Sequence, residues 1–172
     1  MEVLTSNITS YPNNIESQND IEIQYQNERG KPMPSLNHAK LQALIAAYFV
    51  VNYGDIYDIF TEIEVELLDK RAVPDLAIYP IQATDWESDV IRRTDAPILT
   101  IEILSPKQAL DDILSKIRTI YFPGGVQSSW VVIPAMRTIS VMTLDKKIKS
   151  YTEGIVNDEV SGFEIDLNKI FK

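Results

Sequence analysis

The chain has 172 residues, a formal net charge of −9 and no cysteine. This length suits one domain, and the lack of cysteine excludes disulfide bonds and thiolate metal sites. No stretch approaches the roughly 18 apolar residues of a transmembrane helix, and the start lacks a secretory signal pattern, so we expect a cytoplasmic protein without membrane contact.

The negative charge argues against strong non-specific binding to nucleic acid, because nucleic-acid-binding domains usually show a basic surface. It leaves room for a local basic groove, or for a bound cation that supplies positive charge. The sequence has no phosphate-binding glycine loop, no dinucleotide motif and no zinc spacing, so we expect no nucleotide cofactor. A single histidine without cysteine also disfavours a Ser-His or Cys-His hydrolase.

The N-terminal part of the chain predicts a polar arm followed by a helix. Residues 1–20 are rich in Ser, Asn and Thr, and residues 21–25 alternate weakly, as in an edge strand. Apolar residues then recur at helical spacing over residues 36–52, with Ser35 or Asn37 as the N-cap.

Two strands are predicted next. Residues 61–68 alternate strictly between apolar residues and glutamates, which indicates a half-exposed strand. A polar turn at residues 69–71 leads to a second strand over residues 73–79, with Pro74 at its start, where proline is tolerated.

A buried central strand is predicted after a polar connection. Residues 81–96 are polar and have room for a short helix, whereas residues 98–104 are almost continuously apolar. Such a run is typical of a strand that is buried on both faces. A crossover from this strand through a helix to residues 130–133 predicts a parallel strand pair.

The crossover helix has start and stop signals. Ser105 as the cap, Pro106 at the first helical position and Gln108 at the third form a capping box. An apolar stripe continues to Tyr121, and the helix is predicted to end at Pro123.

The C-terminal part predicts further strands at residues 130–133, 138–144, 148–151 and 163–167. A turn at residues 145–147 joins two of these strands into a hairpin. The order of elements therefore indicates an α/β domain with a mixed sheet.

Two carboxylates lie at unusual positions. Glu102 sits inside the most apolar strand, where an ionised carboxylate costs several kcal/mol unless it is paired or binds metal. The alternatives are an ion pair with a nearby Lys or Arg, or an exposed strand end. Asp75 follows Pro74 where another apolar strand begins, and its alternative is an ordinary turn aspartate.

Together these two carboxylates predict a metal site. If their strands are neighbours, Asp75 and Glu102 converge, and two carboxylates with waters and a phosphate oxygen match the coordination that Mg²⁺ prefers, with Mn²⁺ as the alternative. Such an ion polarises a phosphate and lowers the pKa of its bound water.

Other charged residues are weaker candidates. Helical spacing places Lys116 at the border of the apolar stripe and favours a surface pair with Asp112, four residues earlier. His38 at the start of the first helix is a polar or capping residue, or lines a cleft. Glu62 belongs to the polar strand face and Glu28 to a loop, and either is an alternative metal-facing group.

The motifs in chain order resemble a large bacterial family of restriction-endonuclease-like proteins within the PD-(D/E)XK nuclease superfamily. They are Pro74-Asp75, Glu102-Ile103-Leu104-Ser105-Pro106, Asp112 with Lys116, and Gly125-Val126 followed by Trp130. The resemblance runs from about His38 to Met142 and is weaker beyond. It implies a restriction-endonuclease-like α/β core, with a mixed β-sheet flanked by helices and an added C-terminal β-hairpin, in a domain over residues 21–172.

The resemblance also implies roles for particular residues. Asp75 and Glu102 would hold Mg²⁺, with the carbonyl of Ile103 as a further ligand. In the superfamily the lysine usually follows the glutamate by two residues, where this chain has Leu104. In this family the lysine lies on the following helix, which implies that Lys116 orients or activates the attacking water, or stabilises developing charge.

One spacing departs from the family pattern. The family's tyrosine usually follows the lysine by four residues, but Tyr121 follows Lys116 by five. The segment Pro123-Gly124-Gly125 also looks one residue long. We therefore expect a bulged or shifted end of this helix.

These observations lead us to expect a metal-dependent endonuclease that hydrolyses DNA as a homodimer. Two alternatives remain open. The chain is a catalytically inactive member that serves as a binding or assembly module, or it hydrolyses a small phosphoester.

Overall fold

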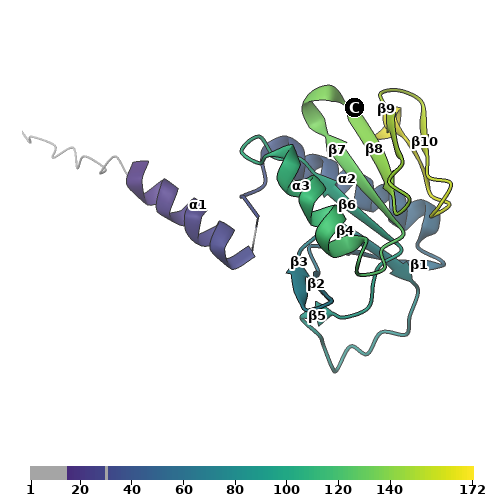
Figure 1. Cartoon of the computed structure of the whole chain (residues 1–172), viewed down its shortest axis with the longest axis horizontal. Helices are drawn as coiled ribbons and strands as arrows, with labels where there is room; N and C mark the ends of the chain where they lie inside the picture. Colours follow the sequence, from purple (N-terminus) through teal and green to yellow (C-terminus); the bar gives the residue numbers. More distant parts are fainter. Residues whose placement is uncertain (1–14, 30) are drawn as a thin grey trace, which may run out of the picture. The chain divides into compact units, whose positions relative to one another are not determined.

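The computed structural model describes residues 15–29 and 31–172 (Figure 1). The chain divides into two units, Met1–Met33 and Pro34–Lys172. Within the described part, every helix is too short or too polar to span a bilayer.

The described part of the first unit is a helix, α1 (Ile15–Arg29). The prediction of an edge strand at residues 21–25 is therefore wrong. Ile21 and Ile23 are both more than half exposed, so their alternation does not mark a buried strand face. Glu and Gln dominate the segment and favour a helix. Most of the predicted arm, residues 1–14, lies outside the described residues.

The second unit is built on a six-stranded sheet with the order β1-β4-β6-β7-β8-β9. Its strands are β1 (Tyr57–Thr61), β4 (Leu76–Pro80), β6 (Leu99–Ile103), β7 (Ser128–Ile133), β8 (Thr138–Thr143) and β9 (Ile148–Tyr151). Only β6 and β7 run parallel within this sheet, and all five residues of β6 are buried. The predicted mixed sheet, with the apolar strand at its centre, is confirmed.

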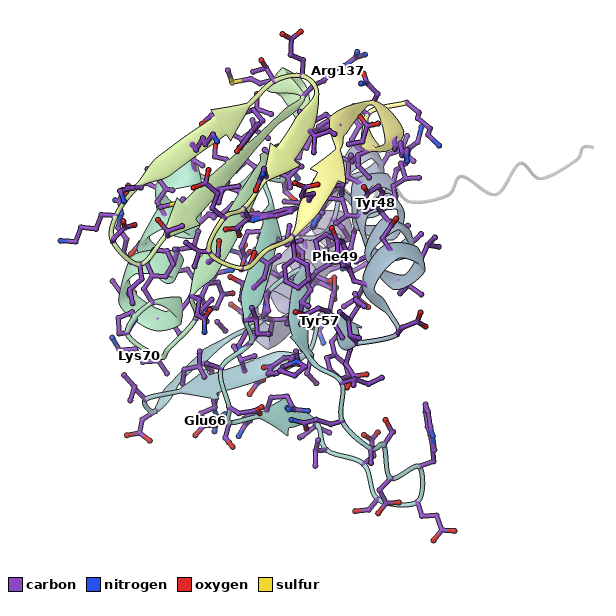
Figure 2. All side chains as sticks on the ribbon, turned by 90° about the vertical axis from the view of Figure 1, so that its right-hand side faces the viewer. Tyr48, Phe49, Tyr57, Glu66, Lys70 and Arg137 are labelled. Carbon is purple, nitrogen blue, oxygen red and sulfur yellow. The ribbon has the colours of Figure 1, made fainter. Side chains whose placement is uncertain are left out.

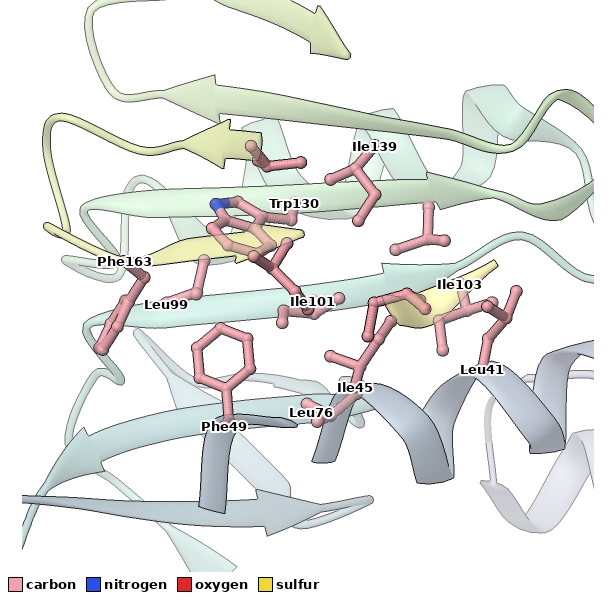
Figure 3. Close-up of a cluster of buried hydrophobic side chains, with 14 of the residues drawn as sticks. Leu41, Ile45, Phe49, Leu76, Leu99, Ile101, Ile103, Trp130, Ile139 and Phe163 are labelled. Atoms are coloured by element: carbon pink, nitrogen blue, oxygen red, sulfur yellow. The ribbon is translucent and has the colours of Figure 1, made fainter. Parts of the chain in front are cut away.

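Helix α2 (Leu36–Tyr53) covers one face of this sheet. Ser35 caps it, because its side chain accepts a hydrogen bond from the His38 backbone N–H. Figure 3 shows Leu41, Ile45 and Phe49 pointing from the helix into the sheet. The Phe49 and Trp130 rings lie 5.7 Å apart, so the predicted helix buries the predicted stripe.

The chain after β9 packs against the same core. Strands β10 (Ile155–Asn157) and β11 (Glu164–Asp166) form an antiparallel hairpin, and α4 (Leu167–Ile170) follows. Asp158 in the hairpin loop is 1% exposed and accepts hydrogen bonds from Ser128 and Trp130 of β7. The sequence predicted β11 but not β10 or α4, which are only three and four residues long.

The opposite face carries α3 (Leu110–Lys116), a π-helical turn η1 (Ile117–Tyr121) and a small sheet. The small sheet consists of β2 (Glu64–Leu67), β3 (Lys70–Ala72) and β5 (Arg92–Arg93) in the order β3-β2-β5. Val65, Leu67, Ile113 and Ile117 form the second buried cluster with Val131 of β7.

Three predictions on this side are corrected. The predicted strand 61–68 is split, because Glu62 has a φ of 56° and turns the chain from β1 to β2. The connection 81–96, all of it described, contains β5 rather than a short helix, since Arg92 pairs with Glu64 and Glu66 of β2.

The third correction concerns the start of the crossover helix. It begins at Leu110 and not at Ser105, and its N-cap Ala109 has no capping side chain. The Ser105 carbonyl accepts a hydrogen bond from the Gln108 N–H at 3.0 Å, which closes a turn before the helix starts.

Candidate functional site

Asp75 and Glu102 meet across two neighbouring strands. β4 and β6 are antiparallel, with Leu76 opposite Ile101. One further step along this register places Asp75 opposite Glu102. Side chains at opposite positions have Cβ atoms about 5 Å apart. Both residues are 2% exposed, so the two carboxylates that the sequence predicted to converge are both buried and lie at opposite positions of this register.

Asp75 is held by groups from three directions. Its Oδ2 accepts a hydrogen bond from the Ile103 backbone N–H at 2.7 Å and lies 3.0 Å from His38 Nε2. Nδ1 of the buried His38 lies 3.3 Å from Ser105 Oγ. The Gln42 side chain donates to the Asp75 backbone carbonyl at 3.0 Å. Helix α2 and the end of β6 therefore fix the orientation of this carboxylate.

Glu102 is held by side chains from α3 and η1. Lys116 Nζ lies 3.1 Å from its Oε1 and 3.0 Å from its Oε2. The fully buried Tyr121 hydroxyl donates to Oε1. The surface pair of Lys116 with Asp112 favoured by helical spacing is thus wrong, since Lys116 reaches the strand carboxylate.

The electrostatics of Glu102 follow from its burial. Desolvation raises the pKa of Glu102, the Lys116 ammonium opposes this shift, and the Asp75 carboxylate adds to it. Burial and the neighbouring Glu102 charge likewise raise the pKa of Tyr121 well above its ordinary value, so Tyr121 stays a hydrogen-bond donor.

The π turn explains how Lys116 and Tyr121 reach one carboxylate. Five residues of regular α-helix rotate a side chain by about 500°, which leaves the two side chains on different faces. In η1 the Phe122 N–H bonds to the Ile117 carbonyl, five residues back, so residues five apart lie about one turn apart. The π turn accommodates the one extra residue between Lys116 and Tyr121 that the tyrosine spacing indicated.

The weaker candidates have different surroundings. Glu62 lies near the site, because its N–H donates to the Asp75 carbonyl and Gln42 Nε2 lies 3.5 Å from its Oε1. Asp112 is exposed in the first turn of α3. Glu28 lies in α1 and not in the predicted loop, and its side chain lies outside the described residues, so its role stays a prediction.

Three residues of the site were not predicted as such. Tyr121 was expected to be a core residue, Ser105 a helix cap, and Gln42 was not singled out. Gln42 follows His38 by four residues, which places both on one face of the helix. Tyr121 occupies the tyrosine position of the family motif, so that motif was the available signal.

Asp75 and Glu102 carry the hard oxygen donors that a divalent cation binds. Glu102 contacts Lys116, whereas Asp75 contacts His38 and the Ile103 backbone N–H. Over the described residues, no group of three or more His, Asp or Glu side chains is arranged to hold a metal ion. Asp75, Glu102 and the Ile103 carbonyl would therefore leave several positions to water and substrate, as Mg²⁺ sites commonly do.

A comparison with protein families finds a match over residues 10–168 to the family described as "Uma2: Putative restriction endonuclease". The chain belongs to the Uma2 family. Of the motif residues, Asp75 and Ser105 both contact His38, and Lys116 contacts Glu102.

A solved structure supports the fold assignment of this Uma2 member. The chain is similar to a crystal structure described as a "putative nuclease belonging to DUF820" from Anabaena variabilis ATCC 29413, with a TM-score of 0.71 and 23% sequence identity. The match covers 82% of this chain and 83% of that chain. No match was found among curated proteins.

Proposed function

We propose that this Uma2 protein is a metal-dependent endonuclease that hydrolyses DNA phosphodiester bonds. One observation carries the proposal: Asp75, immediately before β4, lies opposite Glu102 of β6, and Lys116 Nζ lies 3.0 Å from Glu102. The family description and the nuclease-like fold support the same reaction class.

The proposed roles follow from the contacts of each residue. Asp75 and Glu102, with the Ile103 carbonyl, would hold Mg²⁺ or Mn²⁺. A cation held there supplies polarisation of the scissile phosphate and a lowered pKa for its bound water. Lys116 is the nearest cation to Glu102 and would orient the attacking water or neutralise charge that develops on the phosphate.

The remaining residues position this group. Tyr121 donates to Oε1 of Glu102 and fixes the rotamer of that side chain. His38 and the Ile103 N–H fix Asp75. Such supporting contacts are typical of metal sites, where they orient the ligands.

A plasmid-nicking assay with added Mn²⁺ or Mg²⁺ tests the proposal. Glu102→Gln keeps the shape of the side chain and removes its charge, so we expect a loss of roughly 100-fold or more in nicking rate. The matched control is Glu87→Gln in the exposed connection before β5, which should nick like wild type. Equal nicking rates for wild type and Glu102→Gln would contradict the proposed catalytic role of Glu102.

The same assay reports on the proposed homodimer. Two sites in one dimer can cut both strands of a duplex, and C2 dimers are the commonest oligomers. We expect linear plasmid to form together with nicked circles. Nicked circles alone, at all protein concentrations, contradict the dimer.

An inactive binding module is the second candidate, and a specific contact favours it. Lys116 bonds both oxygens of Glu102, which alone compensates the buried charge. This candidate predicts that Mn²⁺ does not raise the melting temperature more for wild type than for Asp75→Asn. A larger rise for wild type supports the metal site.

A further inference from the structure

A pocket of about 160 Å³ beside the N-terminal half of α2 is lined by basic side chains. Lys40, Arg137 and Lys172 line it together with Asn37, over the apolar residues Leu41 and Ile170. Figure 2 shows the Arg137 side chain reaching away from the sheet at one end of the molecule's second unit. None of the lining residues has an acidic side chain.

These cations stand out in an acidic chain, which has 25 acidic and 16 Lys or Arg residues. Six other described cations contact a carboxylate: Arg71, Arg92, Arg93, Lys116, Lys147 and Lys149. Among the residues that the structure describes, neither Lys40 nor Arg137 forms an ion pair. Their charge is available to an anion from solution.

The pocket lies at the same end of the sheet as the carboxylates. β6 and β7 are parallel, and β7 leads through η2 (Pro134–Met136) to Arg137. Arg137 therefore sits at the end where Glu102 and Ile103 complete β6. Two strand spacings separate β6 from β8, which is roughly 10 Å. On α2, Asn37 and Lys40 flank His38, and His38 contacts Asp75.

Arg137 has a backbone conformation that its residue type rarely adopts. Its φ of 49° and ψ of 41° are left-handed, a region that glycine and asparagine enter more easily than arginine. The chain thus places a long cationic side chain where a short polar one would be less strained.

We propose that this basic pocket binds a backbone phosphate of the nucleic-acid substrate, a few nucleotides from the scissile bond. The proposal rests on the proposed nuclease function. Lys and Arg are the usual partners of nucleic-acid phosphates. Phosphates recur regularly along each strand, so a phosphate near the scissile bond comes within reach of the pocket.

The test measures binding of a fluorescent 20-base-pair DNA in EDTA over a series of salt concentrations, so that no cleavage occurs. Lys40→Gln and Arg137→Asn should each weaken binding several-fold and reduce the slope of log affinity against log salt by about one. Arg137→Asn should melt at or above the wild-type temperature, because asparagine tolerates the left-handed backbone.

The matched control is Lys146→Asn. Lys146 is also an exposed cation with a left-handed backbone, at a φ of 66°, but its turn follows β8 at the opposite end of the sheet. Lys146→Asn should bind DNA like wild type. An equal loss of DNA affinity in this control would contradict the proposed phosphate site and indicate a general effect of the protein's charge.

The outcomes separate this inference from the proposed function. Wild-type affinity and salt slope in both pocket variants, or no salt-dependent binding by wild type, would overturn the pocket. If wild type nicks the plasmid while the pocket variants bind DNA normally, the nuclease proposal is supported and the phosphate-binding proposal is contradicted. If the pocket variants bind DNA weakly but wild type never nicks the plasmid, the phosphate-binding proposal is supported and the nuclease proposal is contradicted.

Discussion

Glu102 illustrates at the residue scale how the burial of an acidic side chain affects stability. Burial raises the pKa of Glu102 above its ordinary value of 4.5, so the folded state binds its proton more tightly than the unfolded state. The resulting stabilisation is full below pH 4.5 and is lost as pH rises through the folded pKa.

We therefore expect a pH-dependent difference between wild type and Glu102→Gln in metal-free buffer. The melting temperature of wild type should fall relative to that of the variant as pH rises above about 4.5, because only wild type has a buried carboxyl group to ionise at position 102. Thermal melts from pH 4 to 8 in EDTA measure this difference. Parallel curves would show that Glu102 does not titrate with a raised pKa.

His38 is the second residue whose contacts predict a measurable effect. His38→Gln removes the imidazole 3.0 Å from Asp75 Oδ2, so Asp75 should lose its fixed orientation. We expect the Mn²⁺ concentration for half-maximal nicking to rise about 10–100-fold. Ser105→Ala leaves the His38–Asp75 contact in place and should cause a smaller rise. An unchanged metal dependence in His38→Gln would contradict the positioning role.

At the scale of single elements, the π turn behaves as an insertion within a helix. Deletion of the exposed Thr119 from η1 should restore a regular helix with the tyrosine four residues after Lys116, the usual family spacing. We expect the fold to survive, with a melting temperature within a few degrees of wild type.

The control for this deletion is the loss of the exposed Ala43 from the middle of α2. That deletion rotates Ile45 and Phe49, both fully buried, by about 100° away from the core. It should cost several kcal/mol of unfolding free energy, since each large core side chain contributes about 2–5 kcal/mol. An equal fall in melting temperature for both deletions would contradict the interpretation of the π turn as an insertion.

Elements with strong local signals were predictable from the sequence. Helix α2 has both an apolar stripe and a cap, and β6 is continuously apolar, so both were located within two residues. The start of α3 was not, because the capping-box residues Ser105 and Gln108 form a turn instead and Ser105 contacts His38. Tertiary contacts at the site overrode the local signal there.

At the scale of the whole molecule, the site was only partly predictable. Asp75 and Glu102 were identifiable because a carboxylate in an apolar strand needs compensation. The direction of Lys116 was not, because helical spacing placed it at the border of the stripe. Only the packing of α3 on the sheet points Lys116 at Glu102, and only the family resemblance predicted a role for Lys116 at the site.

The net charge of −9 also has a different meaning once the fold is known. Glu64 and Glu66 are neutralised by Arg71 and Arg92 on the small sheet. The cations without such partners near the carboxylates form the pocket around Lys40 and Arg137. The overall charge therefore does not describe the surface that substrate would meet.

Asp158 shows that a buried acid need not be reactive. It accepts five hydrogen bonds, from Ser128 Oγ, Trp130 Nε1, Ser161 Oγ and the backbone N–H groups of Val160 and Ser161. A carboxylate offers about four lone-pair directions, so the hydrogen-bonding capacity of Asp158 is fully used. Asp158 thereby links the hairpin to β7. Burial alone therefore does not distinguish Asp158 from Glu102 as a candidate active-site acid. The number of free lone pairs does, because Asp158 has none left to bind a ligand.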